Sequence, residues 1–318
     1  MMMNCVILDD YQNVALQGAD WASLRDRVEV RVLTAHIDDE AELIAALASA
    51  DIVIVMRERT PFPARLFAAL PRLRLLVTSG MRNASIDLQA ARAHGVTVCG
   101  TASSLTPPVE MTWALILGLA RQVVPESLAM RRDGLWQQSI GKDLAGHRLG
   151  LLGVGRIGSA VARVGLAFGM EVSGWSPHFT PERAAAAGVA FAASREQLLA
   201  ESDIVSIHLV LGATTRHLVG AGELALMRRD ALLINTSRAA IVDEAALIAV
   251  LESGRIGGAG LDVFEREPLP PGHPYRTLPN VLATPHLGYV TRDNYATYFR
   301  EAVQDIHAWL DGCPVRSL

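Results

Sequence analysis

The stretch that most constrains the fold of this chain is LGLLGVGRIG, residues Leu149–Gly158. Its apolar start, Leu149–Leu152, has the length and composition of a buried strand, and a helical pattern follows the motif. Of the three glycines between them, Gly153 permits a tight turn and Gly155 has no Cβ to keep a ligand away from the backbone. Gly158 lets the helix pack closely on the strand. Strand, turn and helix in this order predict a site for the pyrophosphate of a dinucleotide.

Short runs rich in Val, Ile and Leu alternate with helical patterns along most of the chain, which is typical of parallel sheets covered by helices. The expected strands are Cys5–Leu8, Val28–Leu33, Ile52–Met56, Leu73–Val77, Val96–Cys99, Leu149–Leu152, Glu171–Trp175, Asp203–Leu209, Ala231–Asn235, Gly258–Val263 and Val281–Ala283. The expected helices include Glu40–Ala50, Pro63–Leu70, Ile86–His94 and Asp243–Leu251. We predict an α/β fold with two doubly wound parallel-sheet (Rossmann-like) domains and a cleft between them.

The two alternating units are separated by Leu105–Arg121, which is almost wholly apolar. A helix that is apolar on all sides is expected to be buried, here between the two domains. The last helical pattern, Arg292–Leu310, has no sheet of its own to cover and is expected to return to the first domain. The predicted domains are therefore a discontinuous one, residues 1–100 with 290–318, and a dinucleotide-binding one, residues 101–289.

Composition excludes several classes of partner. The formal net charge of −4 over 318 residues provides no basic field for nucleic acid or an anionic membrane surface, and no uncharged apolar stretch is long enough to cross a bilayer. The cysteines, Cys5, Cys99 and Cys313, are odd in number and far apart. That pattern is typical of a reducing cytoplasm, and no spacing in the sequence suggests a metal site.

Three polar residues follow strands of the second unit: Arg238, Glu267 and His286. Ligands of open α/β sheets bind beyond the carboxyl ends of the strands, so these side chains can converge on one crevice. An arginine fork can hold a carboxylate and polarise the adjacent carbonyl. A histidine can supply the proton that accompanies hydride transfer, and a neighbouring carboxylate fixes its tautomer. The three suit reduction of a 2-oxo acid. Taken singly, however, Arg238 is also typical of a surface cation, Glu267 of a loop acid and His286 of a cap.

The chain resembles the D-isomer-specific 2-hydroxyacid dehydrogenases, a family that includes phosphoglycerate dehydrogenases and glyoxylate/hydroxypyruvate reductases. The resemblance covers nearly the whole chain and rests on four motifs in the family's order: LGLLGVGRIG, INTSR (Ile234–Arg238), GAGLDVFEREP (Gly258–Pro268) and ATPHLG (Ala283–Gly288). It implies that Arg238 binds the substrate, that Glu267 is the partner of the histidine, and that His286 is the acid/base.

The resemblance implies further contacts. In the loop Ser79–Asn83, backbone N–H groups around Gly80, Met81 and Arg82 are expected to meet the substrate carboxylate, which makes the first domain the substrate-binding one. The residues expected to contact the cofactor, besides the three glycines, are Arg156 and Ile157 at the pyrophosphate, Asp262 at the nicotinamide carboxamide, and Thr236. The family also implies a homodimer.

Several positions depart from the family pattern. Ala239 stands where glycine often follows the arginine, so the local backbone must avoid a glycine-only conformation. Tyr289 replaces a frequent small residue and either narrows the pocket or packs, and Arg82 either meets a second acidic group of the substrate or faces solvent. Eighteen residues after Gly158, where NAD enzymes carry an acid for the ribose 2′-OH, this chain has Ser176. With the acid absent, Ser176, His178, Thr180 and Arg183 can surround a 2′-phosphate, so we expect NAD or NADP with a lean to NADP.

The sequence thus predicts an oxidoreductase that transfers a hydride between a nicotinamide cofactor and a small 2-oxo acid or D-2-hydroxy acid. One alternative is a cofactor-sensing protein like the corepressors of the same fold, which keep the same three residues. Another is an enzyme like formate dehydrogenase, although that branch pairs its histidine with glutamine where this chain has Glu267.

Overall fold

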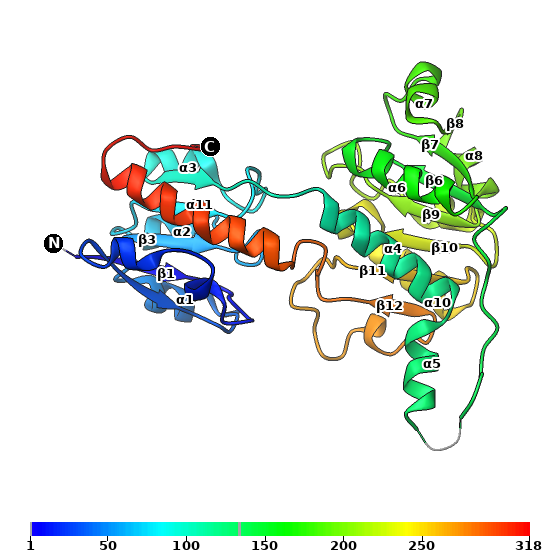
Figure 1. The fold of residues 1–318 in the computed structure, drawn as a ribbon, viewed down its shortest axis with the longest axis horizontal. Helices are drawn as coiled ribbons and strands as arrows, with labels where there is room; N and C mark the ends of the chain where they lie inside the picture. The colour runs from blue at the N-terminus through cyan, green and yellow to red at the C-terminus, as the bar shows by residue number, and fades with distance from the viewer. Residues whose placement is uncertain (1, 133–134) are drawn as a thin grey trace. The chain divides into compact units, whose positions relative to one another are not determined.

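The computed structural model describes residues 2–132 and 135–318, and the chain divides into two compact units. Unit 1 comprises Met1–Ser104 and Val290–Leu318, and unit 2 comprises Leu105–Tyr289. The chain therefore leaves the first unit once and returns to it for its last helix (Figure 1).

Unit 1 is built on a parallel sheet of five strands in the order β2-β1-β3-β4-β5. The order reverses between β1 and β3, as in a doubly wound fold. The strands are β1 (Met3–Ile7), β2 (Val28–Val32), β3 (Ile52–Val55), β4 (Leu75–Thr78) and β5 (Thr97–Gly100). Two of them, β3 and β4, are buried at every position, as expected of strands covered on both faces.

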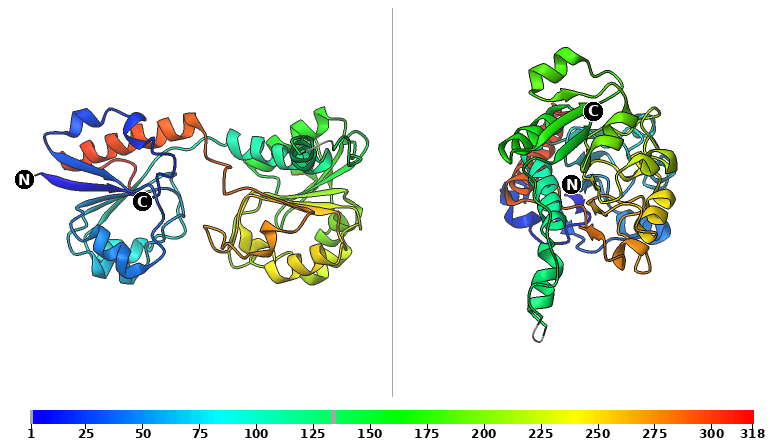
Figure 2. Two further views of the ribbon diagram at one scale, coloured as in Figure 1. Left: turned by 90° about the horizontal axis from the view of Figure 1, so that it is seen from below. Right: turned by 90° about the vertical axis from the view of Figure 1, so that its right-hand side faces the viewer.

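Helices cover both faces of this sheet (Figure 2). On one face, Leu43, Leu66 and Phe67 join alternate strand residues such as Val6 and Leu76 in one apolar core. The other face is covered by the last helix and two short 3₁₀-helices. The helices of unit 1 are α1 (Glu40–Leu47), α2 (Ala64–Ala69), α3 (Leu88–Ala93) and α11 (Arg292–Leu310), with η1 (Ala15–Gln17) and η2 (Trp21–Leu24). The final helix thus lies with the first domain, as the sequence suggests.

Unit 2 is built on a parallel sheet of seven strands in the order β12-β11-β10-β9-β6-β7-β8. The chain runs outward from β6 in one direction and then, through β9, in the other, so the order reverses at β6. The strands are β6 (Arg148–Leu152), β7 (Glu171–Trp175), β8 (Ala190–Phe191), β9 (Ile204–Ile207), β10 (Leu232–Asn235), β11 (Gly258–Leu261) and β12 (Val281–Ala283).

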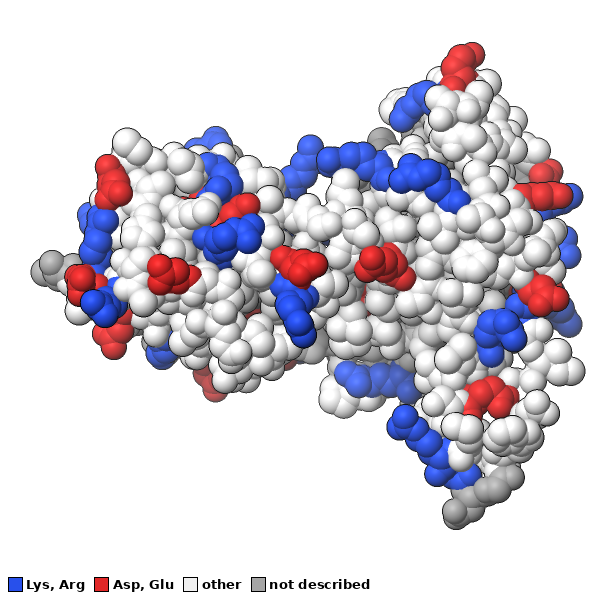
Figure 3. All heavy atoms as spheres, in the orientation of Figure 1, with Lys and Arg blue, Asp and Glu red and all other residues white. Residues whose placement is uncertain are grey.

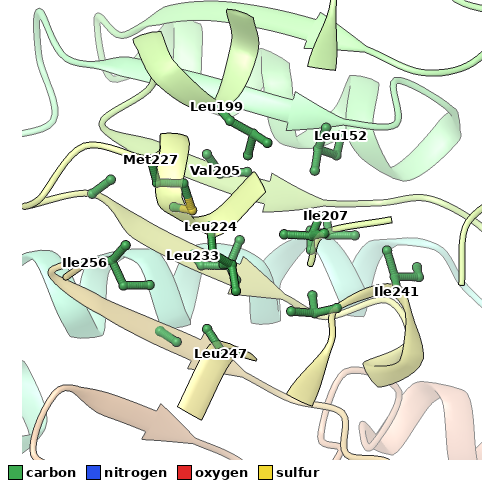
Figure 4. Packing of buried hydrophobic residues seen from close by; sticks show 14 of the residues in the cluster. Leu152, Leu199, Val205, Ile207, Leu224, Met227, Leu233, Ile241, Leu247 and Ile256 are labelled. Carbon is green, nitrogen blue, oxygen red and sulfur yellow. The ribbon is translucent and has the colours of Figure 1, made fainter. Parts of the chain in front are cut away.

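This sheet also separates two apolar cores. In β10, Leu233 faces the core formed with Leu224 and Leu247, which Figure 4 shows from close by. Its neighbours Leu232 and Ile234 face the opposite core, as the twofold alternation of a strand requires. The helices of unit 2 are α4 (Thr106–Ala120), α5 (Val123–Met130), α6 (Arg156–Ala167), α7 (Pro181–Ala187), α8 (Arg195–Glu201), α9 (Ala221–Leu226) and α10 (Glu244–Glu252), with η3 (Ala239–Ile241) and η4 (Pro274–Arg276).

The apolar segment at residues 105–121 forms α4, but it is not buried on all sides. Trp113, Ile116 and Leu119 are buried in the core of unit 2, whereas Glu110 and Ala114 are exposed. The expectation that this helix is buried on all sides is therefore wrong, because its remaining face carries residues such as Ala114 and Glu110 that tolerate water. Among the described residues, no helix is both long and apolar enough to span a bilayer. The face of the molecule in Figure 3 carries charges of both signs, interspersed.

Candidate active site

The glycine-rich turn follows β6, the strand at which the order of the sheet reverses, where doubly wound folds bind their ligands. Gly153 has a φ of +101°, a conformation that favours glycine. A Cβ on Gly158 would lie 2.0 Å from the Gly153 carbonyl oxygen, whereas a Cβ on Gly155 would meet nothing within 4 Å. Gly158 is thus required for packing, and Gly155 leaves open space in front of the first turn of α6. The N–H groups of that turn point towards this space, so the residues present fit a pyrophosphate.

Arg238, Glu267 and His286 follow three neighbouring strands, β10, β11 and β12. These strands are parallel and hydrogen-bonded in sequence, so their carboxyl ends lie along one edge of the sheet. The topology of unit 2 therefore brings the three sequence-predicted residues to the same edge as the glycine turn.

His286 and Glu267 form a hydrogen-bonded pair. The His286 Nδ1 atom lies 2.7 Å from Glu267 Oε2, and both side chains are mostly buried. The other carboxylate oxygen, Oε1, accepts the backbone N–H of Phe264 at 2.9 Å. With Nδ1–H donated to the carboxylate, the imidazole presents Nε2 as the atom that can exchange a proton. The pair has the geometry of a general acid–base and its orienting carboxylate.

The turn that carries His286 is held by Asp262. One oxygen of this carboxylate, Oδ1, accepts the Thr284 hydroxyl at 2.6 Å and the Leu287 N–H at 2.7 Å. The other, Oδ2, accepts the Gly288 N–H at 2.7 Å. Burial raises the pKa of Asp262, while these hydrogen bonds and the nearby His286 oppose that rise.

His286 itself has a φ of +53°, which is uncommon for a residue with a side chain. The Asp262 hydrogen bonds enclose this residue on both sides, at Thr284 before it and at Leu287 and Gly288 after it. Sequence reasoning placed Asp262 at the cofactor and did not find this second arrangement. Asp262 lies 22 residues before Thr284, and nothing in the sequence links it to this turn.

Arg238 begins a short 3₁₀-helix, η3, with an extended backbone. Its loop is fixed by Asn235, whose side-chain amide donates to the Arg238 carbonyl at 3.0 Å and whose oxygen accepts the Ser237 N–H at 3.0 Å. The Ser237 hydroxyl donates to the Leu209 carbonyl. Ala239 lies within η3 in a right-handed conformation, so alanine in place of glycine adds no backbone strain here. Thr236 shares a hydrogen bond of 2.8 Å with Thr112 of α4.

Ser176 directly follows β7, the next strand along the edge from the glycine turn. Thr180 caps α7 by accepting the Arg183 N–H at 3.3 Å. The Arg183 guanidinium donates to the His178 carbonyl at 2.9 Å and lies 5.8 Å from the centre of the Phe179 ring. These contacts draw the cation back towards the turn after β7, and His178, Thr180 and Arg183 are all exposed.

The sequence-predicted substrate loop follows β4 of unit 1, on the other sheet. Asn83 anchors it by donating to the Arg57 carbonyl at 2.6 Å and to the Thr78 hydroxyl at 3.0 Å. The Gly80 N–H already donates to the Thr101 hydroxyl at 3.0 Å. Met81 and Arg82 are exposed, and no bond of their backbone N–H groups to an acceptor is seen in residues 2–132 or 135–318.

His208 directly follows β9 and has a structural role. Its Nε2 atom lies 2.9 Å from the Ser206 hydroxyl, and its backbone forms the wall behind Gly153. Burial lowers the pKa of His208 to about 4, so the ring is neutral at physiological pH.

Known proteins resemble this chain in both sequence and fold. The model of the D-isomer specific 2-hydroxyacid dehydrogenase NAD binding domain matches residues 113–288. A glyoxylate reductase of Aeropyrum pernix is 41% identical over 256 residues, covering 78% of this chain and 76% of the relative. A glyoxylate/hydroxypyruvate reductase B of Serratia proteamaculans is 38% identical over 304 residues, 92% of each chain.

A solved structure of a phosphoglycerate oxidoreductase from Vibrio cholerae superposes with a TM-score of 0.92 at 36% identity, covering 98% of this chain and all of that one. The match spans both units and therefore the whole fold. The chain belongs to the D-isomer-specific 2-hydroxyacid dehydrogenase family, oxidoreductases that transfer a hydride between a nicotinamide cofactor and a small 2-hydroxy or 2-oxo acid.

Proposed function

We propose that this protein reduces a small 2-oxo acid to the D-2-hydroxy acid with Arg238, Glu267 and His286 as its catalytic residues. The observation that carries the proposal is the 2.7 Å contact between His286 Nδ1 and Glu267 Oε2 on the edge of the sheet that also bears Arg238. A histidine whose Nδ1 is held by a carboxylate can both give and take a proton at Nε2, as a reversible dehydrogenase requires.

Each residue has a separate task. When bound, the nicotinamide supplies the hydride to the carbonyl carbon. His286 Nε2 donates the proton that neutralises the developing alkoxide, and Glu267 stabilises the positive imidazolium and keeps the ring oriented. Arg238 pairs with the substrate carboxylate through its planar fork and withdraws electron density from the neighbouring carbonyl.

Glyoxylate and hydroxypyruvate are the first substrates to test, since the names of the two relatives describe reduction of these small acids. Initial rates are measured with each acid and either reduced cofactor, for the wild type and for His286→Gln. We expect turnover in the wild type and a loss of at least ~100-fold in kcat in the variant, with an unchanged cofactor Kd.

The same assay separates the alternatives. A wild type that binds cofactor but turns over no 2-oxo acid supports a cofactor-sensing protein of this fold. Oxidation of formate, with no activity on 2-oxo acids, supports a formate-dehydrogenase-like enzyme. Wild-type kcat in His286→Gln would remove His286 from the mechanism.

We propose that NADPH serves at least as well as NADH. Ser176 puts no negative charge at the end of β7, and the Arg183 guanidinium is held beside the His178 carbonyl at the same turn. Ser176→Asp is expected to shift the preference towards NADH by roughly 5- to 150-fold, since a carboxylate accepts from a ribose hydroxyl and repels a phosphate. Ser176→Asn, which adds size without charge, is the matched control. A strong NADH preference in the wild type contradicts the proposal.

We propose that the protein is a homodimer formed through α5 and the segment after it. Large apolar side chains gather there exposed, which marks an interaction surface. They are Val123, Val124, Leu128, Met130, Leu135, Trp136 and Ile140. Light scattering should give twice the chain mass, and Leu128→Glu should give the monomer. A monomeric wild type contradicts this.

We propose a cytoplasmic location on the basis of the thiols. Cys5 and Cys99 are buried and free, and Cys313 is exposed and free. Free thiols persist in a reducing compartment. A fluorescent fusion expressed in the native host and found outside the cytoplasm would contradict it.

A further inference from the structure

The acid–base pair leaves the orientation of the imidazole incompletely fixed. Within residues 2–132 and 135–318, one hydrogen bond, to Glu267, holds the His286 side chain, and about a quarter of the Glu267 side chain is exposed. The second side-chain torsion of histidine has broad preferences, so water that competes for Glu267 allows the ring to rotate away. Something else must hold the ring if Nε2 is to stay in place between turnovers.

The side chain that does this comes from the same turn. The ring of Tyr289 lies with its centre 5.1 Å from that of the His286 ring, and the two planes are inclined at 77°. This near-perpendicular arrangement is one that aromatic pairs prefer, because it brings the positive edge of one ring to the negative face of the other. Tyr289 is 6% exposed, so its surroundings restrict the movement of its ring.

The backbone next to Tyr289 is held by the same carboxylate that holds the turn around His286. The N–H of the preceding residue, Gly288, donates to Asp262 at 2.7 Å, and a Cβ on Gly288 would lie 2.9 Å from the same oxygen. The turn from Thr284 to Tyr289 is therefore one braced unit, with the imidazole between a carboxylate on one side and an aromatic ring on another.

We propose that Tyr289 is a positioning residue for the catalytic histidine, which it holds in the orientation that keeps Nδ1 on Glu267. The proposal rests on the proposed function, in which His286 is the acid/base. The charged groups that face the imidazole are Glu267, which accepts from Nδ1, and Asp262, which interacts with it electrostatically. Tyr289 stands where the family often has a small residue. It therefore affects proton transfer by His286 and not only the size of the pocket.

The test compares Tyr289→Phe, which keeps the ring, with Tyr289→Leu, which removes it. Tyr289→Leu is expected to lower kcat by about 10- to 100-fold, with smaller changes in the KM for the 2-oxo acid and in cofactor Kd, because a misplaced acid acts on the chemical step. Tyr289→Phe should stay within about threefold of the wild type. Trp113→Leu removes another buried aromatic residue of unit 2, one that packs on Phe168 in the core, and controls for loss of packing.

A second readout does not depend on turnover. The proton on His286 Nδ1, shared with Glu267, should give a low-field NMR resonance that is absent from His286→Gln. We expect it in the wild type, Tyr289→Phe and Trp113→Leu, and expect it to broaden or vanish in Tyr289→Leu. If Leu prevents folding, Tyr289→Met, which fills more of the space, replaces it.

The outcomes separate the two proposals. An inactive wild type whose resonance is lost on removing the ring overturns the proposed function and leaves the positioning contact standing. An active Tyr289→Leu with wild-type kcat and an intact resonance overturns the role of Tyr289. A large rise in KM alone would also overturn it, because Tyr289 would then act on substrate fit.

Discussion

Replacing Asp262 by asparagine removes one acceptor from the turn that carries His286. In the best orientation the amide oxygen keeps the Thr284 and Leu287 bonds, and the amide NH₂ faces the Gly288 N–H, which now has no acceptor. A hydrogen bond to a charged group contributes about 1.5–3 kcal/mol, and a buried donor left without a partner costs about 1–3 kcal/mol. The carboxylate itself is disfavoured by burial, which asparagine avoids and which offsets part of the loss. We expect a net destabilisation of ~1–3 kcal/mol.

The same change should impair catalysis. The left-handed backbone of His286 persists only while the turn is braced, so a relaxed turn misplaces the imidazole. We expect kcat to fall by about 10- to 100-fold. Urea unfolding gives the stability, steady-state kinetics gives kcat, and fluorescence titration gives cofactor Kd. Asp243→Asn is the matched control, since that acid accepts a single N–H at the start of α10, where asparagine caps equally well.

Two results would refute the reasoning. A variant with wild-type stability and kcat shows that the three hydrogen bonds do not brace the turn. A variant with wild-type stability and kcat but a much weaker cofactor Kd shows that Asp262 acts on the nicotinamide carboxamide, as the family resemblance implies.

Three further predictions concern other residues. Arg238→Lys should lower kcat/KM for the 2-oxo acid with little change in cofactor Kd, since an ammonium cannot reproduce the planar fork; an unchanged kcat/KM would place the carboxylate elsewhere. Thr284→Val removes one of the three bonds to Asp262 and should cost about 1 kcal/mol in urea unfolding, less than Asp262→Asn. Burial raises the pKa of Asp305 to about 7, so the folded chain keeps a proton that the unfolded chain releases from about pH 4 upwards. The free energy of unfolding should fall as the pH rises through this window, and Asp305→Asn should show a flatter profile; equal pH profiles would contradict it.

Most of the strands could be predicted from the sequence because most contain a short run rich in Val, Ile and Leu between helical patterns. Glu171–Trp175 and Val281–Ala283 match β7 and β12 at both ends, and the others differ by a few residues at their ends. The edge strand β8 was missed because it is only two residues long, and both Ala190 and Phe191 are exposed. Helix α5 was missed for a related reason, because none of its residues is buried and its apolar side chains form no core-facing stripe.

The types of residue at the candidate site could be predicted, but what holds them could not. Arg238, Glu267 and His286 stand out because each follows a strand and carries a chemistry that the others complete. The contact of Asp262 with the His286 turn depends on β11 and β12 being neighbours with a fixed register, which the sequence does not show. The contact of Tyr289 with His286 depends on the left-handed backbone of His286, which the sequence does not reveal.

The donors that hold Asp262 explain which positions in the turn can vary. Two of the three are backbone N–H groups, of Leu287 and Gly288, which any residue other than proline supplies. Leu287 is also exposed, so its side chain is free to change without loss of the brace. Gly288 is not free, since a Cβ there would lie 2.9 Å from the Asp262 carboxylate. The constraint on the turn therefore falls on Asp262, Gly288 and the rings of His286 and Tyr289, while Leu287 is constrained only in its backbone.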